Sequence, residues 1–142
     1  MGYKNMNWIT YSVMAAVSFS FMVLIYKKLL LLGINQNILN LFIFGIVFIG
    51  FGSIVVYSKT QIKLTSLMIL LLVLASVFSL FGNYFQVKAY NEAPNPGYAS
   101  TIVATQLILI AILSVFLYNS EFTWTKFLGI IIVVFGSYLV SI

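Results

Sequence analysis

Long uncharged runs dominate the pattern of apolar and polar positions along this chain. Charged side chains occur only singly or in pairs between these runs. The runs are, in chain order, 5–26, 29–58, 64–87, 93–120 and 127–142. A membrane-spanning helix needs about 20 apolar residues, so each of the first four runs is long enough for one span and too short for two. The fifth run becomes long enough if its helix begins near Phe122, with Lys126 in the first turn extending to the interface.

The pattern therefore predicts an all-α protein, a polytopic transmembrane helix bundle with five spans. Short turns separate the runs and leave no room for a domain outside the membrane, so residues 1–142 form a single transmembrane domain in this prediction. The predicted spans are 7–27, 37–57, 65–89, 97–118 and 122–141. Function must then lie among the helices or in their brief turns.

The composition supports a location in a lipid bilayer and argues against nucleic acid as a partner. Of the 142 residues, 63% are hydrophobic and 6% are charged, whereas soluble domains carry about 25% charged residues. We expect a multi-pass integral protein of the cell membrane, with the lipid bilayer as its surroundings. The net charge of +5 does not indicate nucleic acid, because the lysines stand between apolar runs and do not cluster on a polar surface.

The inventory of reactive side chains excludes most enzymes. The chain has no Cys, His or Asp, and it has only two Glu. A Ser–His–Asp or Cys–His constellation cannot be assembled, and a protein-built transition-metal site is not expected. We therefore predict no enzymatic activity, no metal and no cofactor.

The lysines are almost evenly divided between the two membrane faces. Alternate turns share a face when there are five spans, so the two sets are Lys4, Lys59, Lys63 and Lys126 on one side and Lys27, Lys28 and Lys88 on the other. Positive charges normally favour the cytoplasmic side. Two interpretations stay open: the bias is weak because the protein is small, or the chain inserts in both orientations or needs a partner to fix one.

A polar stripe runs along the third predicted helix and continues at the start of the fourth. Its members recur every three or four residues and so share one helix face: Ser76, Ser79, Asn83, Gln86 and Tyr90, then Tyr98, Thr101 and Thr105. Hydrogen bonding between helices explains the hydroxyl groups, whereas two carboxamides one turn apart favour a watery cavity or a binding site. The candidate substrate-binding residues are Asn83, Gln86, Tyr90, Thr101 and Thr105, with Tyr11 on the first helix as a weaker candidate.

Two glycines lie seven residues apart on the last predicted helix. Gly129 and Gly136 return to nearly the same face at 100° per residue, and small residues allow helices to approach closely in lipid. That face is either a contact with another helix of the chain or a seam between two subunits.

Part of the chain resembles a known transporter unit. The matching residues are FQVKAYNEAP at 85–94, YASTI at 98–102, and 118–129 with Glu121, followed by Gly136. Their order is a short proline turn, an apolar helix, a turn with Glu and a last helix with Gly-x6-Gly. This order is similar to the carboxy-terminal half of an EamA-like unit in the drug/metabolite transporter superfamily, over about residues 85–142.

The resemblance implies a function and an assembly. EamA-like transporters usually carry two five-helix units in opposite orientations, with the substrate path between them. A single unit then implies a dimer, and an antiparallel homodimer suits the balanced lysines. The expected function is transport of a small metabolite or drug-like solute by alternating access, with Gly129 and Gly136 in dimer or helix packing.

Two alternatives remain from the sequence. The related small multidrug resistance proteins use a membrane-embedded Glu on their first helix, and the first helix here has no carboxylate. Their proton-coupled export of cations is therefore not expected here. The expected substrate is instead a neutral, zwitterionic or anionic solute. The competing hypothesis is a non-transporting membrane subunit, or half of a heterodimeric flippase.

Overall fold

The computed structural model describes residues 8–119, 121 and 123–141, and this part of the chain contains helices and no strand. The helices are α1 (Trp8–Leu31), α2 (Gln36–Tyr57), α3 (Ser66–Glu92), α4 (Pro96–Val103), α5 (Gln106–Tyr118) and α6 (Trp124–Ser141). Four stretches are long and apolar enough to cross a membrane: α1, α2, α3, and α4 with α5 taken together. α6 contains the shorter apolar helix Phe127–Val140. The prediction of an all-helical protein with five spans is confirmed.

The helices differ from the predicted spans mainly at their ends. α1 extends beyond residue 27 to Leu31, and α3 continues past residue 89 to Glu92. A helix can continue beyond the hydrocarbon region of the bilayer. Charged residues therefore mark the end of an apolar run, although the helix itself extends a few residues further. Asn7 and Phe122, the predicted first residues of two spans, lie outside the described residues.

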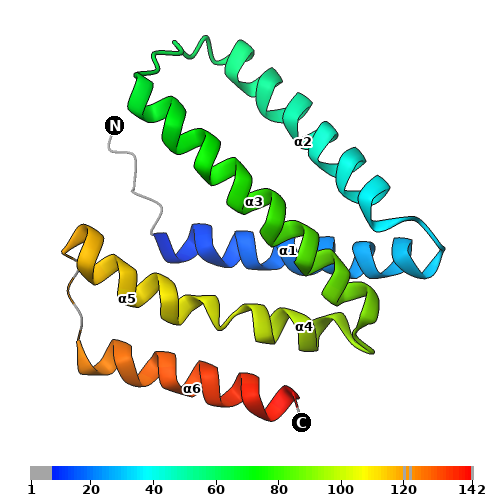
Figure 1. Ribbon diagram of the computed structural model, residues 1–142, viewed down its shortest axis with the longest axis vertical. Helices are drawn as coiled ribbons and strands as arrows, with labels where there is room; N and C mark the ends of the chain where they lie inside the picture. The colour runs from blue at the N-terminus through cyan, green and yellow to red at the C-terminus, as the bar shows by residue number, and fades with distance from the viewer. Residues whose placement is uncertain (1–7, 120, 122, 142) are drawn as a thin grey trace. The chain divides into compact units, whose positions relative to one another are not determined.

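The chain divides into two compact units, 1–91 and 92–142. In the first unit α2 and α3 run antiparallel and are joined by the turn 58–65, while α1 leads into α2 through residues 32–35 (Figure 1). Whether the two units form one transmembrane domain stays a prediction. The first unit contributes the buried residues Tyr26, Leu30, Leu39, Val87 and Tyr90. They belong to the end of α1, the start of α2 and the end of α3, so close packing gathers at one end of this unit.

A lysine strengthens the packing at that end. The Nζ atom of Lys27 in α1 donates to the backbone oxygens of Tyr90 at 3.0 Å and Asn91 at 3.3 Å. The last four carbonyl groups of a helix have no partner within the helix, and they carry partial negative charge. The ammonium group therefore holds α1 to the end of α3 and satisfies two carbonyls there.

Asparagine side chains cap the first turns of α2 and α4, and a glycine follows the end of α1. The side-chain oxygen of Asn35 accepts from the backbone N–H of Asn37 at 2.8 Å, and the side-chain oxygen of Asn95 accepts from that of Gly97 at 2.8 Å. These bonds cap α2 and α4 in the way that asparagine caps usually do. Gly33 turns the chain between α1 and α2 at φ +88°, a left-handed conformation that other residues adopt with strain.

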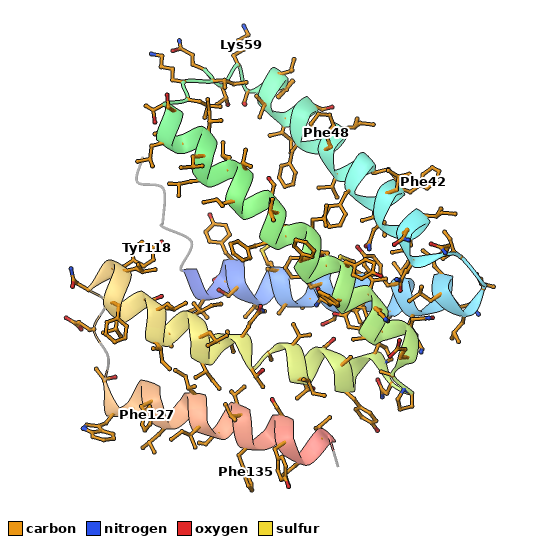
Figure 2. The ribbon with its side chains drawn as sticks, viewed as in Figure 1. Phe42, Phe48, Lys59, Tyr118, Phe127 and Phe135 are labelled. Carbon is orange, nitrogen blue, oxygen red and sulfur yellow. The ribbon has the colours of Figure 1, made fainter. Side chains whose placement is uncertain are left out.

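Most of the apolar surface of the described chain is exposed. Phe42, Phe48 and Phe135 point away from their helices (Figure 2), and Phe48 is 79% exposed. Hydroxyl groups on the same surfaces bond to their own helix, as Ser18 does to the Met14 oxygen and Ser53 to the Ile49 oxygen. Such a surface suits lipid, because each of these hydroxyl groups is satisfied within its helix.

The fourth span is interrupted between α4 and α5, which the sequence did not predict. The backbone N–H of Thr105 donates to the Ile102 oxygen at 3.0 Å, and the Thr105 hydroxyl bonds the same oxygen at 2.7 Å. In a continuous α-helix that N–H would bond to the Thr101 oxygen. No proline or glycine lies between 98 and 118 to indicate the break. The Thr105 hydroxyl bond to the Ile102 oxygen accompanies the break.

A serine on α6 bonds the carbonyl at this interruption. Ser137 is 3% exposed, and its hydroxyl lies 2.9 Å from the Thr101 oxygen and 2.8 Å from the Val133 oxygen. A hydroxyl has one proton to donate, so the two carbonyls share it. α4 and α6 pack against each other in this second unit, and the Ser137 bond joins them.

We predict that Ser137→Ala lowers the free energy of unfolding by about 0.5–1 kcal/mol, because it removes this interhelical bond and leaves the Thr101 oxygen without it. Thermal unfolding of the purified protein in detergent measures the change. Ser53→Ala is the matched control, since Ser53 bonds only its own helix, and it should leave stability almost unchanged. Equal effects of the two substitutions would contradict the joining role of Ser137.

Candidate functional site

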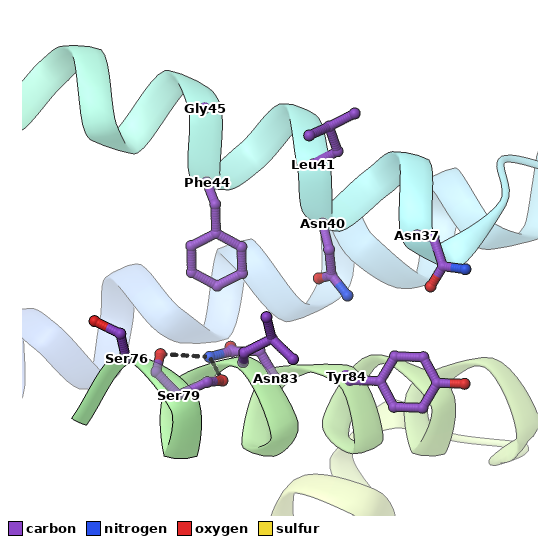
Figure 3. A pocket seen from close by; sticks show the side chains of 10 residues that line it. Asn37, Asn40, Leu41, Phe44, Gly45, Ser76, Ser79, Asn83 and Tyr84 are labelled. Carbon is purple, nitrogen blue, oxygen red and sulfur yellow. Dashed lines mark hydrogen bonds between the residues drawn. The ribbon is translucent and has the colours of Figure 1, made fainter. Parts of the chain in front are cut away.

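A cavity of about 610 Å³ lies between α2 and α3 within the first unit. Its size is within the range of about 300–1,000 Å³ that is usual for small-molecule sites. Ten residues line it: Asn37, Asn40, Leu41, Phe44 and Gly45 from α2, and Ser76, Ser79, Leu80, Asn83 and Tyr84 from α3. Asn37, Asn40 and Phe44 point from α2 toward α3 across this space, whereas Leu41 points away from α3 (Figure 3).

Asn83 places a carboxamide deep along α3. It lies nine residues before the end of the helix at Glu92, which corresponds to about 14 Å along the axis. Its Nδ2 atom donates to the Ser79 backbone oxygen at 2.8 Å and to the Ser79 hydroxyl at 3.2 Å. These bonds use the nitrogen end of the amide, so the Asn83 oxygen is available as an acceptor.

Asn40 is the exceptional polar group of the cavity. It projects from α2 toward α3 (Figure 3), and its Oδ1 atom is buried with no hydrogen-bond partner in the described part of the chain. A buried carbonyl oxygen without a donor destabilises a fold by about 1–3 kcal/mol. Such groups are uncommon in proteins, and each one calls for an explanation. This oxygen has almost no accessible surface, so a solute in the cavity does not reach it.

The remaining walls are apolar and carry no charge. The larger apolar lining residues are Leu41 and Phe44 from α2, and Leu80 and Tyr84 from α3. None of the ten lining residues is ionisable near neutral pH. Such a combination of an apolar body and a few polar groups is typical of small-molecule sites.

The predicted stripe on α3 divides into two parts. Ser76, Ser79 and Asn83 line the cavity. Gln86 instead donates through Nε2 to the Tyr90 hydroxyl at 2.7 Å, and Tyr90 is 1% exposed. This pair lies at the packed end of α3, close to the Lys27 contact.

The other predicted binding residues lie elsewhere. Tyr11 lies on α1, is 58% exposed and is not among the cavity-lining residues. Thr101 and Thr105 belong to the second unit, where their hydroxyls donate to the backbone oxygens of Gly97 and Ile102. A role for Gln86, Tyr90, Thr101, Thr105 and Tyr11 in substrate binding stays a prediction.

Asn37 and Asn40 are the lining residues that sequence reasoning missed. The predicted second span begins at residue 37, and the sequence pattern gave neither asparagine a role; in the structure α2 begins at Gln36. Their spacing of three residues was the available signal, because it places both on one helix face ahead of a long apolar run.

The paired glycines of α6 have an open face within their unit. A Cβ atom built at Gly129 or Gly136 meets no heavy atom within 4 Å, apart from the backbone of α6 itself and the residues next in the chain. No described helix of the second unit therefore uses this face for close packing. Its predicted role as a subunit seam stays a prediction.

We predict that Asn40→Leu raises the free energy of unfolding by about 1 kcal/mol, because leucine has a similar shape and removes the unsatisfied buried oxygen. Asn83→Leu is the matched comparison on the facing helix. It should not stabilise the protein, since the Asn83 amide already has partners. Thermal unfolding of each variant in the same detergent measures the two changes, and a destabilised Asn40→Leu protein would contradict the prediction.

Comparison with known protein families identifies a match. The sequence profile of the EamA-like transporter family matches residues 6–142, so the resemblance seen at 85–142 extends over the first three helices. No curated protein matches the chain, and no solved structure does. Members of the matched family are transporters, which confirms the prediction that the protein is not an enzyme.

Proposed function

The chain belongs to the EamA-like transporter family, and on this premise we propose that it moves a small solute through the cavity between α2 and α3 as a dimer of five-helix units. The family makes the protein a multi-pass membrane transporter of the drug/metabolite type. What we propose beyond family membership is that the solute passes through this cavity, that transport occurs by alternating access, and that two copies form the working transporter.

The cavity between α2 and α3 is the observation that carries the proposed path. A scaffold subunit gains nothing from a space of this size that is lined by carboxamide and hydroxyl groups. A transporter has a use for it, because a passing solute can bond to the polar groups that line the space. The cavity volume of about 610 Å³ accommodates a metabolite-sized solute.

The polar composition supports the substrate class. The described residues contain no group of His, Cys, Asp and Glu that could hold a metal ion, and no carboxylate lines the cavity. We therefore do not propose that an acidic group in the cavity couples proton movement to the export of a cation. The proposed substrate is a neutral, zwitterionic or anionic solute.

Two features support the dimer. In each candidate span, at most 6% of the most apolar stretch is buried inside the described structure. A single copy therefore leaves most of its helix surface to lipid or to a second chain. The open glycine face on α6 then provides a place for close helix contact. The balanced lysines allow the two copies to insert in opposite orientations.

Proteoliposomes loaded with a metabolite extract test transport while the substrate is still unidentified. We predict that mass spectrometry identifies at least one solute that leaves vesicles containing the protein and stays in empty vesicles. The Asn40→Leu/Asn83→Leu variant should reduce its efflux at least about tenfold, the effect of losing about 1.4 kcal/mol of binding. Ser53→Ala on α2, which does not line the cavity, should transport normally. Unchanged efflux in the double variant would remove the proposed path.

Single cysteines test the dimer, because the chain contains no cysteine of its own. We predict that Ile132→Cys, near the midpoint between Gly129 and Gly136, forms a self-crosslinked dimer under mild oxidation, since the centre of an antiparallel helix pair meets its own copy. Ile131→Cys lies on another face of α6 and is the control. Topology reporters at the carboxy terminus should report both membrane sides. A single orientation without a crosslink at residue 132 would favour a heteromeric subunit instead.

A further inference from the structure

The fourth span changes its hydrogen-bonding pattern over a short stretch between α4 and α5. The pattern is regular up to Ala104, whose backbone N–H donates to the Ser100 oxygen at 2.9 Å. The N–H groups of Thr105, Leu107 and Ile108 then donate to oxygens only three residues earlier, at 3.0, 3.0 and 3.1 Å. An α-helix would use oxygens four residues earlier. These are the bonds of a 3₁₀ turn, which often marks a hinge when it lies within a longer helix.

The segment before this turn is held in place. Pro96 and Ala99 of α4 are buried, and α4 packs against α6. The Ser137 hydroxyl of α6 bonds the Thr101 oxygen at 2.9 Å, two residues before the end of α4. Packing and a hydrogen bond therefore join α4 and α6 into one pair.

The segment after the turn lacks such support. No residue of α5 is buried in the described structure, and Phe116 near its end is 77% exposed. α6 lies alongside α4 and α5 diverges from it (Figure 1), and no packing comparable to that of α4 and α6 joins α5 to α6 in the described part of the chain. The two halves of the fourth span therefore differ in what resists their movement.

We propose that residues 103–105 are a hinge about which α5 turns while α4 stays fixed on α6. The Thr105 hydroxyl keeps the hinge open, because it bonds the Ile102 oxygen at 2.7 Å, which the Gln106 N–H would use in a continuous helix. A hinge of this kind is a few residues that absorb a change in φ and ψ. It is a property of the second unit alone, and only its use in transport rests on the proposed function.

Two pairs of spin labels measure the hinge by pulsed electron paramagnetic resonance in lipid nanodiscs. The chain has no cysteine, so labels attach only where one is introduced. Leu117→Cys with Leu139→Cys is the α5–α6 pair, and Tyr98→Cys with Leu128→Cys is the α4–α6 pair. All four side chains are exposed. Dilution with unlabelled protein restricts the measured distances to those within one copy.

The widths of the two distance distributions decide the matter. A bend of about 20° at residue 105 moves residue 117, about 18 Å along the helix, by about 6 Å. We expect the distribution of the α5–α6 pair to be wider than that of the α4–α6 pair by about this amount. Equal widths would overturn the hinge.

Two threonine substitutions in the labelled chains assign the motion to the turn. Thr105→Ala removes the hydroxyl from the Ile102 oxygen, so the Gln106 N–H can bond there and make the helix continuous. The α5–α6 distribution should then narrow to the width of the α4–α6 pair. Thr101→Ala is the matched control, since the Thr101 hydroxyl bonds the Gly97 oxygen within α4, and it should change neither width. An unchanged α5–α6 width in Thr105→Ala, or equal narrowing in Thr101→Ala, would overturn the proposal.

The outcomes distinguish this inference from the transport proposal. A wide α5–α6 distribution that Thr105→Ala narrows, with no efflux of any solute from vesicles, would support the hinge and remove transport through the cavity. Efflux from vesicles together with equal widths for the two label pairs would preserve transport and overturn the hinge.

Discussion

The absence of water around a membrane-spanning helix is the constraint on which the rest of this structure depends. Each backbone or side-chain polar group within the bilayer must find its partner inside the protein. Exposed serines meet the requirement by bonding to the preceding turn of their own helix, as Ser18 and Ser53 do. Ser137 also bonds a neighbouring helix, at a carbonyl released where the fourth span is interrupted. Asn40 does not meet the requirement within the described residues.

The same constraint explains why so little of the chain is buried. Lipid accepts apolar side chains as readily as a protein core does, so phenylalanines such as Phe48 can stay exposed without penalty. Close packing is confined to places where polar groups or turns bring helices together. In the first unit that place is the end where Lys27 binds the last carbonyls of α3 and where Leu39 and Tyr90 are buried.

The constraint is relaxed at the cavity between α2 and α3, whose lining includes three carboxamide side chains. The absence of charge among its lining residues sets it apart from the acidic sites that exchange protons for cations. At Asn40 the buried oxygen without a partner lowers the stability of the resting structure.

The sequence by itself determined the number of spans, the all-helical fold and the family, because uncharged runs of known length and the motifs near Glu121 and Gly136 are local features. It also placed Asn83 on the polar face of α3 that lines the cavity, while a role for Asn83 in binding stays a prediction. It could not identify Asn40, since the role of a single asparagine within an apolar span depends on the helix that faces it. Nor could it separate Asn83 from Gln86, which differ only in the partner each one finds. Tertiary structure decided these points, because a hydrogen-bond partner is set by proximity in space and not by spacing along the chain.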